Sequence, residues 1–142
     1  MKKILLTILL AALVTTCTAQ PPIEISTTSD AAIFAEKWVS LLNNRDYSTA
    51  WIATTKEFKE NRTLDKWPID DNPARNFTPV PNTTKVIKAY RLTQLPLRGP
   101  GDYRQVEVTT ESTSGALWHD LVTIGKINGK WLVMGHSPWK TN

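Results

Sequence analysis

The last third of the chain decides its fold: residues 103–112 read YRQVEVTTES, residues 117–127 read LWHDLVTIGKI and residues 131–136 read WLVMGH. Apolar and polar residues alternate in these segments, which is the period of a β-strand with one buried face. Asn128-Gly129 separates the last two segments, and both residue types tolerate the positive φ of a tight hairpin. The sequence therefore predicts three strands that run as an antiparallel meander.

A fourth strand is predicted just before these three, over residues 85–95. Its alternation is irregular, because Val86 and Tyr90 share one parity while the apolar Ile87 has the other. A strand that is covered on both faces, or one that contains a β-bulge, explains such a pattern.

An amphipathic helix is predicted in the first half of the chain, with Ser29 as its N-cap. Its apolar stripe has spacings of four, three and four residues and consists of Ala31, Ala35, Trp38 and Leu42. The polar run of residues 43–46 ends it.

Two shorter helices are predicted to follow. The first starts at Tyr47 and carries Trp51 one turn later; the second spans residues 56–67 and ends before Pro68. Residues 69–84 contain several prolines and predict a loop that covers a pocket or wraps the sheet. Helices followed by a meander predict an α+β domain, in which a curved four-stranded antiparallel sheet packs around the first helix.

The N-terminus has the features of a bacterial signal peptide. Lys2 and Lys3 precede the apolar residues 4–14, which are too few to span a bilayer, so no membrane span is expected. Two processing routes fit the sequence. Cleavage after Ala19 gives a soluble exported chain, whereas lipidation of Cys17 gives an outer-membrane lipoprotein.

Cleavage after Ala19 predicts three parts: a signal peptide at 1–19, a flexible leader at 20–28 and one domain at 29–142. The mature chain then has no cysteine, which excludes disulfides and thiolate catalysis. Its 15 Lys and Arg against 13 Asp and Glu give a charge of only +2, and no basic cluster is interleaved with aromatic residues, so no nucleic-acid partner is expected. No phosphate-binding glycine loop is present and no cofactor is expected.

The order of helices and strands resembles the cone-shaped, cystatin-like fold of nuclear transport factor 2, and in more detail the bacterial domain of unknown function family 4019. The resemblance covers nearly the whole mature chain. It is carried by residues 35–42, Arg45-Asp46-Tyr47 with Trp51, Phe58-Lys59, Trp67, Arg75, Leu95-Pro96, Gly101-Asp102-Tyr103 and residues 131–136. The chain departs from the family pattern at two places, with Asp120 after His119 where the family tends to have Glu, and His136 after Gly135 where it tends to have an aromatic residue. The family has no established activity, so the resemblance implies a fold and an envelope location.

Asp120 is the candidate catalytic residue. Its parity in the strand places it inward between Trp118 and Val122, where apolar surroundings would raise its pKa and suit it to general acid–base catalysis. The structural alternative is that Asp120 pairs with a buried base or a helix backbone, and Arg75 and Arg91 are candidate partners. Tyr90 or Tyr47 would assist a catalytic role.

The histidines and tryptophans are not predicted to be catalytic. His119 and Asp120 point to opposite faces of one strand and do not share a site. His119 and His136 are expected at the surface or rim, and no motif indicates a metal site. The candidate ligand-binding aromatic residues are Trp51, Trp67, Tyr90 and Trp118. Trp51 and Trp118 also fit ordinary core positions, while Trp67 is expected at a pocket rim.

Three functions remain open from the sequence. The preferred one is a non-enzymatic periplasmic or envelope protein that binds a small apolar ligand or a partner protein. The second is a cone-fold enzyme, such as an isomerase or dehydratase, that uses Asp120 as general acid or base. The third is a structural accessory domain of an envelope assembly.

Overall fold

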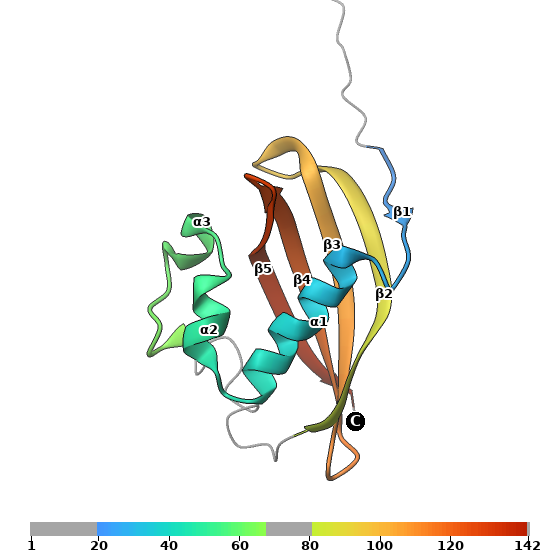
Figure 1. Ribbon diagram of the computed structural model, residues 1–142, viewed down its shortest axis with the longest axis vertical. Coiled ribbons are helices and arrows are strands. Elements are labelled where there is room, and N and C mark those ends of the chain that lie inside the picture. The colour runs from blue at the N-terminus through green and yellow to red at the C-terminus, as the bar shows by residue number, and fades with distance from the viewer. Residues whose placement is uncertain (1–19, 68–80, 142) are drawn as a thin grey trace, which may run out of the picture.

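The structure, a computed structural model, describes residues 20–67 and 81–141. It has an α+β fold in which helices pack on one face of an antiparallel sheet (Figure 1). The strands follow one another in sheet order as β1 (Ile23–Glu24), β2 (Pro81–Leu95), β3 (Gly99–Ser112), β4 (Leu117–Ile127) and β5 (Lys130–Thr141). The predicted class and meander are therefore confirmed, but the sheet has five strands and not four.

The additional strand, β1, comes from the segment that was expected to be a flexible leader. Ile23 and Glu24 pair with Arg91 and Tyr90 of β2. Pairing does not extend upstream, because Pro21 and Pro22 have no backbone N–H to donate. A strand of two residues is too short to show the alternation of a strand in the sequence.

The turns confirm the local sequence signals. Asn128 and Gly129 both have positive φ, 51° and 78°, as a tight β4–β5 hairpin requires. In β2 the register shifts between Val86 and Lys88, so that Ile87 is the extra residue. A β-bulge therefore explains the irregular alternation of this strand.

The described residues before β2 include the helices α1 (Asp30–Asn43), α2 (Tyr47–Ile52) and α3 (Lys56–Lys59). The Ser29 hydroxyl accepts from the Ala32 N–H, which confirms the predicted N-cap. The third helix is shorter than the predicted residues 56–67. Asn61 and Thr63, which are weak helix formers, follow directly after it. None of the helices in the described residues is long and apolar enough to cross a bilayer.

α1 lies across one side of the sheet, which we call the inner face, and the opposite side is the outer face (Figure 1). The segment between α2 and α3 attaches to the edge of β5, because Val133 exchanges backbone hydrogen bonds of 2.9 Å with Ala53 and Thr55. The hydrophobic core lies between α1 and the inner face. Its largest buried apolar side chains are Trp38, Val39, Phe58, Trp67, Val106, Val108, Val122, Ile124 and Val133.

Candidate functional site

Asp120 lies on the inner face of β4 with a fully buried side chain, 0% exposed. Its neighbours of the same parity, Trp118 and Val122, are also buried. The inward orientation predicted from the strand period is therefore confirmed. A carboxylate in this position needs polar partners, because an unpaired buried charge is strongly unfavourable.

One partner of Asp120 is His136 of β5. His136 Nε2 lies 2.8 Å from Asp120 Oδ1, and the histidine side chain is only 1% exposed. The expectation that His136 lies at the surface was wrong. Of the two bases considered as partners, Arg91 is exposed and lies near Asp102, and Arg75 is outside the described residues.

A shift in the β4–β5 register turns His136 inward. Thr123 pairs with Gly135 and Ile124 pairs with Val133, so Met134 is an extra residue in β5. An extra residue reverses the parity of the residues beyond it. Val133 and His136 therefore both face inward. In a strand with regular alternation, as the sequence predicted, residues three positions apart would face opposite sides.

The second nitrogen of His136 has no polar partner. Nδ1 is buried and has no hydrogen bond within the described part of the chain. The Trp38 ring packs against the imidazole with centroids 5.0 Å apart at 76°, while Trp38 Nε1 donates to the Ala50 carbonyl. With Asp120 ionised, Nε2 carries the proton that it donates, and a neutral ring then leaves Nδ1 with a free lone pair.

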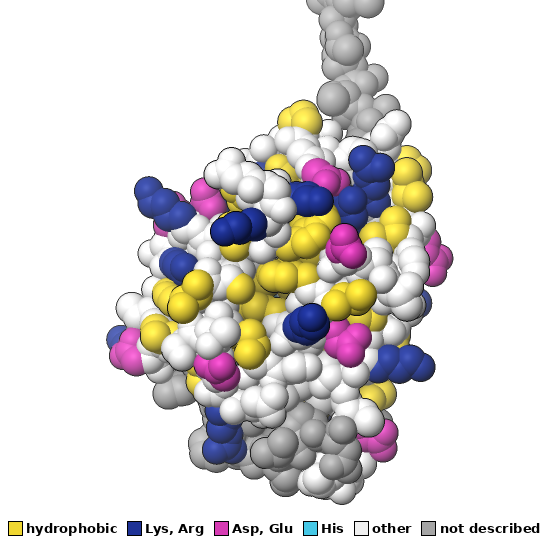
Figure 2. Space-filling model, viewed as in Figure 1, with side chains coloured by type: hydrophobic (Ala, Val, Ile, Leu, Met, Phe, Trp, Pro, Cys, Tyr) yellow, Lys and Arg dark blue, Asp and Glu magenta, His cyan; other side chains and the backbone are white. Residues whose placement is uncertain are grey.

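Aromatic side chains surround this pair on the α1 side. Trp67 is only 2% exposed, and its ring lies 5.6 Å from Trp51, 5.6 Å from Phe58 and 5.9 Å from Trp38. Trp67, expected at a pocket rim, instead lies in the core. Figure 2 shows hydrophobic side chains gathered near the centre of this side of the molecule and ringed by charged ones, and no histidine is visible among the residues described there.

The predicted ligand-binding residues do not form one pocket. Trp51 and Trp67 are in contact, and Trp118 lies further along the inner face with Lys140 over its ring at 5.8 Å. Tyr90 follows the inward Ala89 and pairs with Gln105, which places it on the outer face. Tyr90 therefore cannot act together with the inner-face aromatic residues.

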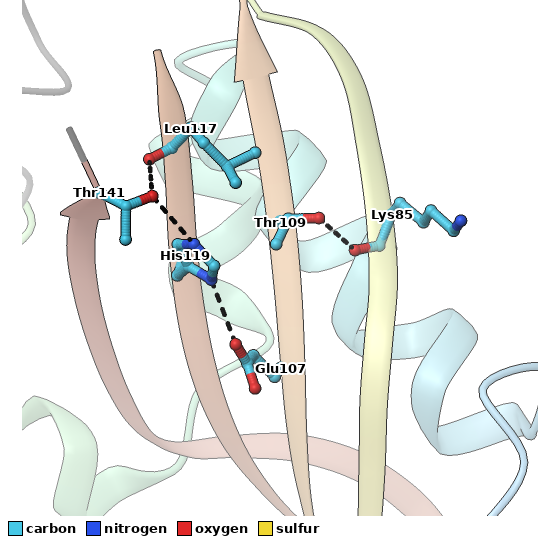
Figure 3. A network of polar contacts seen from close by, with 6 residues as sticks. All are labelled: Lys85, Glu107, Thr109, Leu117, His119 and Thr141. Carbon is cyan, nitrogen blue, oxygen red and sulfur yellow. Dashed lines mark hydrogen bonds and ion pairs between the residues drawn. The ribbon is translucent and has the colours of Figure 1, made fainter.

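His119 lies on the outer face in a separate network (Figure 3). Its Nδ1 is 3.1 Å from Glu107 Oε1 and its Nε2 is 3.3 Å from the Thr141 hydroxyl. Trp139 stacks on the imidazole with centroids 4.9 Å apart. The prediction that His119 and Asp120 do not share a site is confirmed, because opposite faces of β4 hold them.

A cavity of about 750 Å³ lies at the hairpin end of the sheet, between α3, the β2–β3 turn and the ends of β4 and β5. Tyr103 and Met134 form its floor over two glycines. A Cβ on Gly101 would lie 2.4 Å from Tyr103 Cζ, and one on Gly125 would lie 2.5 Å from Met134 Sδ. The Tyr103 ring and the Met134 sulfur can lie there only because Gly101 and Gly125 have no side chain.

Charged residues surround the mouth of this cavity. Glu57 of α3 and Arg98 of the β2–β3 turn form an ion pair at 3.6 Å across it. The Glu57 backbone N–H, the Thr55 hydroxyl and the Arg98 charge hold the pKa of Glu57 below its ordinary value. The sequence does not indicate this cavity, because α3 and the two hairpin ends are distant along the chain and Gly125 meets Tyr103 only through strand pairing.

Among the described residues, no three His, Cys, Asp or Glu side chains group closely enough to hold a metal ion. No protein-family model, curated protein or solved structure matches this chain. The geometry of the site is therefore the basis for any functional assignment.

Proposed function

We propose that this chain is a non-enzymatic protein of the bacterial envelope that binds a small ligand in the cavity at the hairpin end of the sheet. The cavity of about 750 Å³ is the observation that carries the proposal. Small-molecule sites typically have volumes of about 300–1,000 Å³, an apolar lining and a few polar groups. Tyr103, Met134 and Leu97 supply the apolar lining, and Glu57 and Arg98 supply polar groups.

The proposed location of the ligand differs from that of Trp51, Trp67 and Trp118, the inner-face residues that the sequence offered as ligand-binding candidates. The described part of the space under α1 is filled by Trp38, Phe58 and Trp67, which pack with one another. A ligand there would have to displace close-packed aromatic side chains, which is unfavourable. The cavity beside α3 is open without any such displacement.

Family membership is part of the proposal. We assign the chain to the cone-shaped relatives of nuclear transport factor 2, near the bacterial domain of unknown function family 4019. The support for this is the order of the elements, in which helices precede one antiparallel meander. Mass spectrometry of the mature N-terminus tests the export, by distinguishing cleavage after Ala19 from lipidation at Cys17.

A fragment screen by ¹H–¹⁵N NMR on the mature chain tests the binding function. Ligands are expected to shift the amides of Tyr103 and Gly125. The Gly125→Ala variant should weaken binding, because its methyl group pushes Met134 Sδ from its position. The control is Gly135→Ala, whose Cβ would meet Thr123 at an ordinary 3.6 Å. Shifts spread over the whole sheet, or equal binding by both variants, would refute the assignment of this cavity.

A second candidate function, an enzyme of the isomerase or dehydratase kind, is favoured by the Asp120–His136 pair. Asp120 would fix the Nε2–H tautomer, and Nδ1 of His136 would accept the substrate proton after the Trp38 ring, which packs against the imidazole, moves aside. Activity on small hydrophobic substrates should then be lost in both Asp120→Asn and His136→Gln. His119→Gln, on the outer face, should retain it. Activity that survives Asp120→Asn would exclude this role.

A further inference from the structure

The floor of the hairpin-end cavity has a flat aromatic surface. Tyr103 pairs with Gly125 of β4 and lies against Gly125 and Gly101, so its ring rests on backbone and not on side chains. The Met134 sulfur lies beside it on Gly125. An aromatic face and a thioether both favour contact with another ring, and an aromatic face also attracts a cation.

The mouth of the cavity has more carboxylates than cations. Its acidic residues are Glu57, Glu60 and Asp102, and its basic residues are Arg98 and Lys126. Each basic residue already has a contact: Arg98 pairs with Glu57 within the mouth, and Lys126 Nζ lies 5.2 Å over the Trp131 ring, which does not line this cavity.

The acidic groups are not all neutralised. Asp102 accepts a hydrogen bond from Arg104 and lies 3.9 Å from Arg91 Nε. Glu60, by contrast, has no ion pair within the described residues. A positive charge on a ligand would therefore find the Glu60 carboxylate at the mouth, beside the Glu57–Arg98 ion pair.

We infer that the cavity takes a flat apolar group that carries an amine or guanidinium, either as a small aromatic amine or as a basic aromatic peptide. The inference rests on the proposed binding function and specifies its ligand class. The ring of the ligand lies on Tyr103 and Met134, and its cation lies near Glu57 and Glu60.

The test is an NMR titration of the mature chain with three probes: phenethylammonium, 3-phenylpropionate of similar size and opposite charge, and the capped dipeptide Arg-Trp amide. Phenethylammonium should shift the amides of Gly101, Tyr103 and Gly125 saturably, and 3-phenylpropionate should bind at least about fivefold more weakly. Tighter binding of the dipeptide than of the amine would identify a peptide as the ligand source; the reverse would identify a free amine.

Charge variants give the matched control. Glu60→Gln should weaken phenethylammonium binding about two- to fivefold, the size expected for one exposed ion pair. Glu111→Gln, an equal charge change in β3 but outside the cavity lining, should not. Equal affinity for the anionic probe, or no effect of Glu60→Gln, would overturn the ligand class but leave the binding function standing. If neither these probes nor any fragment shifts the cavity amides, the binding function itself fails.

Discussion

Val133 and His136 both face the inner side of the sheet, although three positions separate them in one strand. The extra residue between them, Met134, reverses the parity of β5 and brings His136 within 2.8 Å of Asp120. The same bulge places the Met134 sulfur over Gly125 in the floor of the cavity. One irregularity of a strand thus forms part of both candidate sites.

Insertion of one alanine between Gly135 and His136 should reverse the parity of β5 beyond that point and turn His136 to the outer face. Asp120 would lose a buried partner, a loss that typically costs about 3–5 kcal/mol. Urea unfolding measures the change. Met134→Leu is the control, since it keeps the bulge and a similar volume and should cost less than about 1.5 kcal/mol. An insertion variant as stable as the parent would mean that the parity of β5 does not position His136.

Asp120 and His136 should be energetically coupled. Asp120→Val leaves the buried His136 Nε2 without its hydrogen-bond partner, and His136→Phe removes one buried partner of Asp120, so each should be destabilising. The double variant removes both groups, so its loss of unfolding free energy should be smaller than the sum of the two single losses by about 1–3 kcal/mol. The measurement is a double-mutant cycle from urea unfolding. Additive losses would show that the contact contributes no coupling.

Asp46 should make α2 sensitive to acid. Hydrogen bonds from Thr49, first its side chain and then its backbone N–H, hold the pKa of Asp46 below its ordinary value. The folded-state pKa is lower than the unfolded one, so the stabilisation is present above the unfolded value near 4 and is lost as pH falls through the folded pKa. A ¹³C titration of the carboxyl group checks this. Asp46→Asn should keep the N-cap but lose the acid dependence, and an ordinary or raised pKa would contradict the prediction.

Ser29 should anchor the start of α1. Its hydroxyl accepts from the Ala32 N–H, so Ser29→Ala should lower the free energy of unfolding by about 1 kcal/mol. Ser29→Asn supplies the same acceptor and should stay near the parent. Thermal unfolding measures the stability of the two variants. An equal loss of stability in both would mean that the Ser29 side chain does not act as an N-cap.

Replacement of Gly129 or of Gly115 by alanine should lower the free energy of unfolding by similar amounts. Both have φ near 80°, and a Cβ at either position would meet nothing within 4 Å, so the cost is conformational, about 1 kcal/mol each. Gly125→Ala is different, because its Cβ collides with Met134 Sδ at 2.5 Å. Unfolding midpoints of the three variants should separate a backbone cost from a steric one.

Local rules determined much of this protein. The N-cap at Ser29, the period of β4 and the Asn128-Gly129 turn each depend on a few neighbouring residues, and the structure has them where the sequence predicted them. The inward orientation of Asp120 follows from the same two-residue period. These features could be read without knowing what any segment packs against.

Only the tertiary structure decided which strands pair and which side chains are in contact. The β1–β2 pairing, the bulge at Met134 and the Asp120–His136 contact arise from backbone hydrogen bonds between strands that local sequence patterns do not encode. The cavity forms where α3 meets two hairpin ends that are far from it in the chain. Orientation within a strand is a local property, whereas register and contact depend on the whole folded chain, which is why the sequence indicated Asp120 but not His136.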